Sequence, residues 1–233
     1  MNLEKLYRDL SFGELSNLSL SGNGSGTILE KDRPKVLHAI NEALLRLFAR
    51  FDLKVKDTVI QTYKHITFYR LLPRYAESQE DTSPEDYLYI KDLFREPFID
   101  DVLKVMSVYD GRNNRLPLND SAQPNSLFTP ETKLLQVPDP RDNQYLSIIY
   151  RAKHPELTGD LDQEIEVPDV LHSAVRSYTA YHLYNNMGTE GAVATGSMHL
   201  NKFEVTCAEV IAQDLVNSSI VSTNTRFERG GWI

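Results

Sequence analysis

Residues 167–188 read VPDVLHSAVRSYTAYHLYNNMG, and this stretch decides the fold class that the sequence predicts. Pro168 and Asp169 are typical of a helix start, and Gly188 is typical of a helix end that adopts the left-handed conformation. Apolar residues recur between them at the three-and-four spacing of a buried helix face. The members of this face are Leu171, Ala174, Val175, Tyr178 and Tyr181. The stretch therefore predicts an amphipathic helix.

A second helix is predicted directly after this one, from about residue 190 to residue 216. Its inward side is expected to carry Val193, Leu200, Phe203, Cys207, Val210 and Ile211. Because only a very short turn separates the two helices, they are expected to form an antiparallel helical hairpin.

A third helix is predicted near the other end of the chain, where residues 32–51 read DRPKVLHAINEALLRLFARF. Asp32 is placed to cap this helix and Pro34 suits its first turn. The inward stripe is expected to be Val36, Leu37, Ile40, Leu44, Leu47, Phe48 and Phe51. Together with the hairpin, this helix predicts a helical bundle.

The middle of the chain has a different pattern. Residues 58–72, 101–110 and 144–152 alternate or run apolar and are rich in Val, Ile, Tyr and Phe, which is typical of strands. The predicted fold class is therefore α+β, with a small β-rich region inserted into the bundle and an extended C-terminal arm. The predicted parts are an N-terminal segment, a glycine-rich link and a first bundle helix (1–52), the inserted region (53–166), the helical hairpin (167–217) and the arm (218–233).

Composition indicates a soluble protein with a core of ordinary size. The chain has 233 residues, of which 41% are hydrophobic and 25% charged, and its formal net charge is −8. An acidic surface repels nucleic acid, and no local basic cluster opposes it. The first 15 residues predict neither a signal peptide nor a membrane anchor. With one cysteine, Cys207, the chain can form no internal disulfide, which fits a reducing compartment.

Three glycines raise the question of a phosphate-binding loop, in the stretch LSGNGSGTILEKDRPKV at residues 20–36. Gly22, Gly24 and Gly26 alternate with small polar residues, but no strand precedes them and no Gly-Lys-Ser/Thr follows. Because such glycines populate many backbone states, the stretch predicts a flexible, extended link at a subunit boundary rather than a nucleotide site.

The other residue patterns that carry chemistry are absent or structural. The six histidines show no spacing that places two metal ligands on one helix face, and no G-x-S-x-G elbow occurs. Cys207 lies on the apolar face of its predicted helix, where a free cysteine behaves as a small hydrophobe. Paired carboxylates such as Glu164 and Glu166 are typical of solvated surface. We therefore expect no catalytic residue, no cofactor and no metal.

The last 17 residues, NSSIVSTNTRFERGGWI, predict an arm that binds a partner. Ser, Thr and Asn give way to aromatic and Arg side chains, the types that dominate binding energy at protein interfaces. The predicted anchors are Arg226, Phe227, Arg229, Trp232 and Ile233. The alternative is that the arm folds back on its own bundle.

The order of four phrases resembles the head-to-tail adaptor (connector) proteins of tailed bacteriophages, particularly short-tailed ones. The phrases are FGELSNLSLSGNGSGTI (12–28), DRPKVLHAINEALLRLFARFDL (32–53), VPDVLHSAVRSYTAYHLYNNMGTEGAV (167–193) and RFERGGWI (226–233). The resemblance covers nearly the whole chain and brings no catalytic residues. It rests on segment order rather than on a catalytic signature.

This resemblance implies a structural virion protein in a ring of twelve copies, assembled in the host cytoplasm and placed between the portal protein and the tail or nozzle proteins. DNA would pass through the ring without sequence-specific binding, and no membrane would be involved. The inserted β region would face outward or toward the tail, and the arm would reach along the portal. A tail-completion or tail-tube ring protein stays open as an alternative, as does a soluble enzyme of unknown type.

Overall fold

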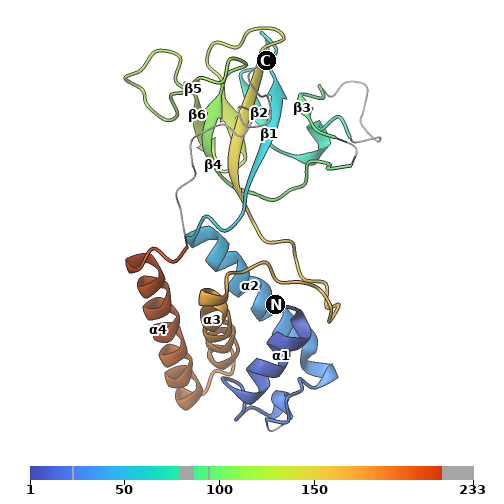
Figure 1. Cartoon of the computed structure of the whole chain (residues 1–233), viewed down its shortest axis with the longest axis vertical. Coiled ribbons are helices and arrows are strands. Elements are labelled where there is room, and N and C mark those ends of the chain that lie inside the picture. Colours follow the sequence, from blue (N-terminus) through green and yellow to red (C-terminus); the bar gives the residue numbers. More distant parts are fainter. Residues whose placement is uncertain (23, 79–86, 94, 217–233) are drawn as a thin grey trace, which may run out of the picture. The chain divides into compact units, whose positions relative to one another are not determined.

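The computed structural model describes residues 1–216 except residues 23, 79–86 and 94. The described chain contains four α-helices and two antiparallel sheets, so the predicted α+β class is confirmed. It forms two compact units, shown in Figure 1: a helical unit made of residues 1–53 and 154–216, and a β unit that spans residues 54–153. The predicted C-terminal arm lies outside the described residues.

The helical unit is built around α3. Its helices are α1 (Leu3–Phe12), α2 (Arg33–Arg50), α3 (His172–Asn185) and α4 (Glu190–Ala212), with short 3-10 turns at Ser19–Ser21, Glu30–Asp32 and Asp169–Leu171. The helix α3 contacts α1, α2 and α4, which explains why it is buried around most of its circumference. Grouping of these helices into the wall of a ring stays a prediction.

The helix α2 follows the sequence pattern closely, although its cap differs. Val36, Ile40, Leu44 and Leu47 are buried along one face, as the spacing predicts. Pro34 lies in the first turn, where the missing amide hydrogen costs nothing. Asp32, however, makes no side-chain capping bond, because it has helical backbone angles and ends a preceding 3-10 turn.

The hairpin of α3 and α4 depends on a glycine at its contact. A Cβ atom at Gly196 would lie 3.3 Å from the backbone nitrogen of Asn185 and 3.4 Å from the carbonyl oxygen of Tyr181. The absence of a side chain therefore lets α4 approach the last turn of α3 closely. Gly188 lies in the connecting turn with a φ of 69°, in agreement with the predicted left-handed conformation.

The helix α4 corrects the predicted hairpin in two respects. It ends at Ala212 rather than near residue 216. Its buried stripe is Gly196, His199, Phe203, Cys207 and Val210. Val193 and Ile211, which the spacing predicts to be inward, are 38% and 58% exposed. The reason is that α4 packs on α3 along one narrow side, so residues at the edge of the apolar arc stay in solvent.

Residues 154–166 belong to the helical unit rather than to the insertion in which the sequence analysis places them. Their backbone runs along α1: the amide of Leu3 donates to the carbonyl of Gln163 at 3.1 Å, and the amide of Ile165 donates to the carbonyl of Met1 at 2.7 Å. Leu157 and Ile165 are buried. The inserted unit is therefore shorter than predicted, at residues 54–153.

The β unit contains a five-stranded sheet in the order β3-β1-β8-β4-β5 and a three-stranded sheet in the order β2-β7-β6, all antiparallel. The first sheet consists of β1 (Val55–Gln61), β3 (Ile90–Lys91), β4 (Val102–Tyr109), β5 (Arg115–Leu116) and β8 (Tyr145–Ala152). The second consists of β2 (Phe68–Arg70), β6 (Phe128–Glu131) and β7 (Leu134–Gln136).

The predicted strand at 58–72 is two strands in different sheets. The first half is β1, which pairs with β8 from Val55 opposite Arg151 to Gln61 opposite Tyr145. The second half is β2, which pairs with β7. Thr62 breaks the run, because its buried hydroxyl donates to the carbonyl oxygen of Arg141 and its amide to that of Gln144. The predicted strands at 101–110 and 144–152 are β4 and β8.

Candidate interaction surfaces

Side chains that carry chemistry do not converge in the described structure. No group of three or more His, Cys, Asp or Glu side chains among the described residues could hold a metal ion. The ring of His38 meets that of His182 edge-on at 5.5 Å, and His199 stacks on Tyr184. Burial lowers the pKa of His199, helped by nearby Lys202, which favours the neutral imidazole that stacks on Tyr184.

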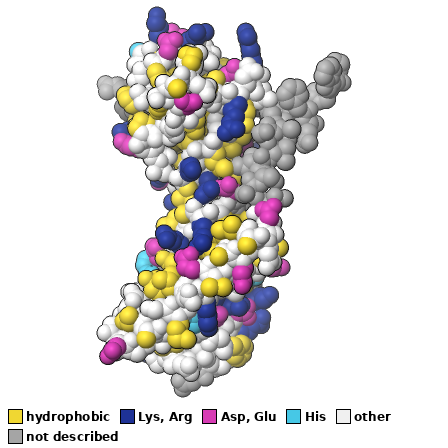
Figure 2. Space-filling model, turned by 90° about the vertical axis from the view of Figure 1, so that its left-hand side faces the viewer, with side chains coloured by type: hydrophobic (Ala, Val, Ile, Leu, Met, Phe, Trp, Pro, Cys, Tyr) yellow, Lys and Arg dark blue, Asp and Glu magenta, His cyan; other side chains and the backbone are white. Residues whose placement is uncertain are grey.

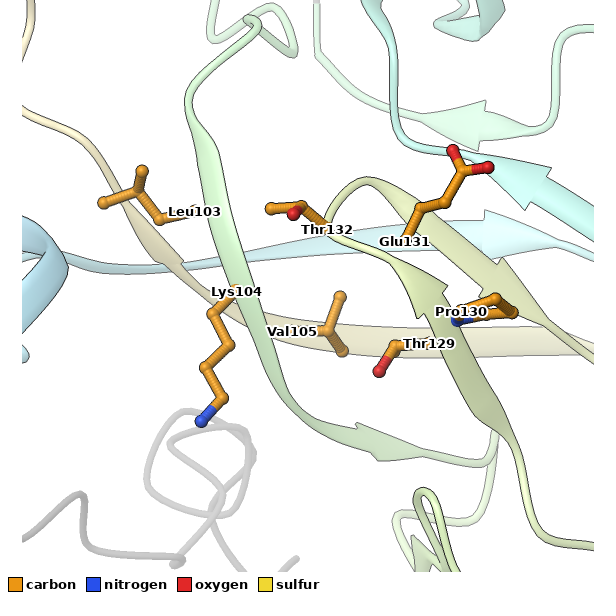
Figure 3. Close-up of a pocket in the computed structure, with 7 residues that line it drawn as sticks. All are labelled: Leu103, Lys104, Val105, Thr129, Pro130, Glu131 and Thr132. Atoms are coloured by element: carbon orange, nitrogen blue, oxygen red, sulfur yellow. The ribbon is translucent and has the colours of Figure 1, made fainter.

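An open hollow of about 310 Å³ lies on the β unit between β4 and the end of β6. Figure 3 shows its lining, in which the ammonium group of Lys104 and the carboxylate of Glu131 point in different directions. The remaining lining residues are Leu103, Val105, Thr129, Pro130 and Thr132. The two ionisable side chains of the lining, Lys104 and Glu131, therefore do not converge on one point.

Two buried groups that could react are accounted for by packing. Cys207 is fully buried, and burial raises its pKa from 9.0 to about 11, so the thiolate is scarce at neutral pH. Asp101 is buried in the β unit, where its carboxylate accepts hydrogen bonds from the ammonium of Lys56 and from the hydroxyl of Tyr150 at 3.2 Å. The Asp101 carboxylate thus has structural partners, and neither residue lines the hollow on the β unit.

The glycine-rich stretch is a folded turn against the end of α1. Gly22, Gly24 and Gly26 have φ values of 58°, 75° and 85°, in the left-handed region that favours glycine. The amide of Leu29 donates to the carbonyl of Leu20 at 2.9 Å and closes the turn. The predicted extended course is therefore wrong for this stretch. Its predicted place at a subunit boundary stays a prediction.

Ser11 holds this turn in place. Its hydroxyl is buried, lies 2.9 Å from the carbonyl oxygen of Ser21 and 3.2 Å from that of Thr27, and accepts the amide of Gly26 at 3.1 Å. The sequence analysis did not single out Ser11. The sequence does contain a sign of this role: Ser11 is a polar residue on the buried side of an amphipathic segment, and a buried hydroxyl needs hydrogen-bond partners nearby.

The excess of acidic over basic side chains lies in one part of the chain. Residues 154–216 contain ten acidic and two basic side chains, whereas residues 1–53 contain seven of each sign. Six of the acidic side chains are exposed between residues 156 and 169, on the segment that runs along α1 and on the 3-10 turn that follows it: Glu156, Asp160, Asp162, Glu164, Glu166 and Asp169. The net charge of −8 is thus mainly a property of this segment and of the α3–α4 hairpin.

The outward side of α4 is the second unusual surface. Met198 is 65% exposed and Val205 is 48% exposed, and both lie opposite the buried stripe of this helix. Figure 2 looks onto the side of the helical unit where α4 lies, and hydrophobic side chains are scattered over it between charged ones. Along α4 itself, however, Met198 and Val205 share one side with other uncharged residues, and an apolar helix face of this kind is a candidate surface for binding protein.

The predicted partner-binding residues of the arm lie outside the described residues, so the structure brings none of them together with another site. They are Arg226, Phe227, Arg229, Trp232 and Ile233. Among the described residues, no helix is both long enough and apolar enough to cross a membrane.

Comparison with protein families gives the deciding observation, because the family model described as SU10 adaptor protein matches residues 15–225. The chain belongs to this adaptor family. The match includes all of α2, α3 and α4 and the whole β unit. No curated protein matches the chain. The resemblance to phage head-to-tail adaptors is confirmed, and membership of an adaptor family implies a structural role in the virion.

Proposed function

We propose that this SU10-family adaptor is a head-to-tail adaptor in the virion neck. Copies of the chain, twelve in number, form a ring between the portal protein and the tail or nozzle proteins, and the ring encloses the DNA channel. The observation that carries the proposal is the family match over residues 15–225, which covers both units of the fold. Assembly takes place in the host cytoplasm.

The charge distribution supports passage of DNA without binding. The carboxylates of residues 154–216 outnumber basic side chains by ten to two, so surfaces formed by this segment repel phosphates. We propose that some of this segment faces the channel. A map of the potential on an assembled ring tests this, and a strongly basic channel wall would contradict it.

The arm is proposed to bind the portal. Its Arg and aromatic side chains are the types that anchor protein interfaces, and the closing Trp232 is the only tryptophan of the chain. An arm that becomes ordered on its partner has an entropic cost, which burial of Phe227, Trp232 and Ile233 offsets.

The test is to remove residues 225–233 and measure binding to purified portal protein. The truncated chain is expected to keep the circular dichroism spectrum of the intact chain and to lose portal binding at least a hundredfold. The double variant Phe227→Ala/Trp232→Ala is expected to show most of this loss, whereas Asn224→Ala serves as a matched control with little effect. Unchanged affinity of the truncated chain would refute the role of the arm. Binding of the intact chain to tail components alone would favour a tail-completion or tail-tube protein.

A further inference from the structure

The outward side of α1 presents an apolar residue in a rigid setting. Leu3, Leu6 and Leu10 form the buried side of this helix, and Phe12 lies on the opposite side, 61% exposed. Arg8 is exposed one turn before it. The glycine turn fixes this corner, since a Cβ atom at Gly26 would lie 2.6 Å from the Phe12 ring. Phe12 is thus an exposed apolar side chain held against the glycine turn, one helical turn after a positive charge.

The outward side of α4 has the complementary character. Its members at positions 194, 198, 201, 205, 208 and 212 are Ala, Met, Asn, Val, Ala and Ala, and none is charged. Ala194 and Ala208, on the same side as Met198 and Val205, have small side chains. Glu204, at the border of this side, pairs with Arg50 of α2, and the other charges at its borders are Glu190, Glu209 and Lys202. An exposed apolar side chain with a basic neighbour fits this surface.

These two surfaces cannot meet within one copy. In Figure 1, α3 lies between α4 on one side and α1 on the other. The buried side of α4 faces α3 and the buried side of α1 faces the same core, so the two outward sides point away from each other. Two different, complementary patches on opposite flanks of a unit are the arrangement that joins copies head to tail and closes into a ring.

We infer that the two patches bind each other between neighbouring copies: Phe12 and Arg8 of one copy dock on the outward side of α4 of the next, against Met198 and Val205. The inference rests on the proposed ring and names its contact faces. It also assigns a purpose to the glycine turn, which holds Phe12 in position at the boundary between copies.

Cysteine cross-linking tests the contact directly. The variants Phe12→Cys, Met198→Cys and the double variant are treated with a short bismaleimide, with the chain alone and with portal protein present. The double variant is expected to give a ladder of covalent oligomers, and an equimolar mixture of the two single variants is expected to stop at dimers. Each single variant alone and the unmodified chain are expected to stay monomeric, because native Cys207 is buried.

The same contact is tested without cross-linker by sedimentation of Met198→Glu and Phe12→Glu. Both sites are exposed, so the variants should fold, and each is expected to weaken self-association at least tenfold. Cross-linking of Met198→Cys to itself would show two-fold pairing and overturn the inference. A double variant that stays monomeric, alone and with portal, would also overturn it. Loss of portal binding on arm truncation would still stand in that case, so the inference and the proposed function fail separately.

Discussion

Replacement of Ser11 by Ala distinguishes a folded glycine turn from a flexible link. The Ser11 hydroxyl is buried against Ser21 and Gly26, and an alanine methyl group fills most of the same space. The substitution therefore removes hydrogen bonds and leaves packing nearly intact. If the glycine stretch were a flexible link, the loss would not affect the free energy of unfolding.

The expected magnitude follows from the bonds that the hydroxyl makes. It has one hydrogen, which serves the carbonyl of either Ser21 or Thr27, and it accepts one bond from the amide of Gly26. Because each hydrogen bond contributes about 1 kcal/mol, loss of both should lower the free energy of unfolding by about 2 kcal/mol. The loss stays below the larger cost of an orphaned buried carbonyl, because the oxygen of Ser21 keeps a bond from the amide of Gly24.

Urea unfolding followed by circular dichroism measures the free energy, and amide exchange at Leu29 measures the turn itself. The Leu29 amide is a suitable reporter because its bond to the carbonyl of Leu20 closes the turn. Ser25→Ala is the matched control, since that hydroxyl bonds only the exposed side chain of Thr27 and its loss should change stability by less than about 0.5 kcal/mol. If Ser11→Ala and Ser25→Ala unfold and exchange alike, the reasoning is refuted.

Two further predictions concern α4. Phe203→Ala should lower the free energy of unfolding by about 3–5 kcal/mol, because the ring is fully buried and packs edge-on against Tyr178 at 5.0 Å. As a control, Val205→Ala lies two positions away at a half-exposed site and should lower the free energy of unfolding by less than about 1 kcal/mol in the same urea titration. Cys207 should react with a thiol reagent at pH 8 only when the protein is unfolded. Because burial raises its pKa from 9.0 to about 11, its contribution to stability is present below pH 9 and declines as the pH rises toward 11, which unfolding titrations at several pH values can follow.

Elements with strong local periodicity could be predicted from the sequence. The helix α2 and the strands β4 and β8 lie within one or two residues of the predicted ranges, because each carries a continuous apolar pattern of one period. The short strands β3, β5 and β6 could not be predicted in this way. They have two to four residues and exist through pairing with partners distant in sequence, and β6 even contains Pro130.

The surfaces were harder to predict than the elements. The spacing on α4 marks Val193 and Ile211 as inward, but only one neighbouring helix covers this side, so Gly196 and His199 complete the buried stripe instead. The apolar periodicity of a helix predicts which side faces the core, but it does not predict how many residues of that side the neighbouring helix covers. The glycine turn was missed for a related reason: glycine permits both an extended link and a left-handed turn, and the hydroxyl of Ser11 decides between them.

The pairing of β1 with β8 has a consequence for how such proteins diversify. The amide of Ala152 donates to the carbonyl of Lys54 at 2.9 Å, so the chain leaves the helical unit and returns to it through two adjacent strand ends. An insertion whose ends already lie together adds little loop-closure entropy to its host. Residues 54–153 therefore form a cassette that recombination can exchange, lengthen or delete while the helices on either side of it keep their contacts.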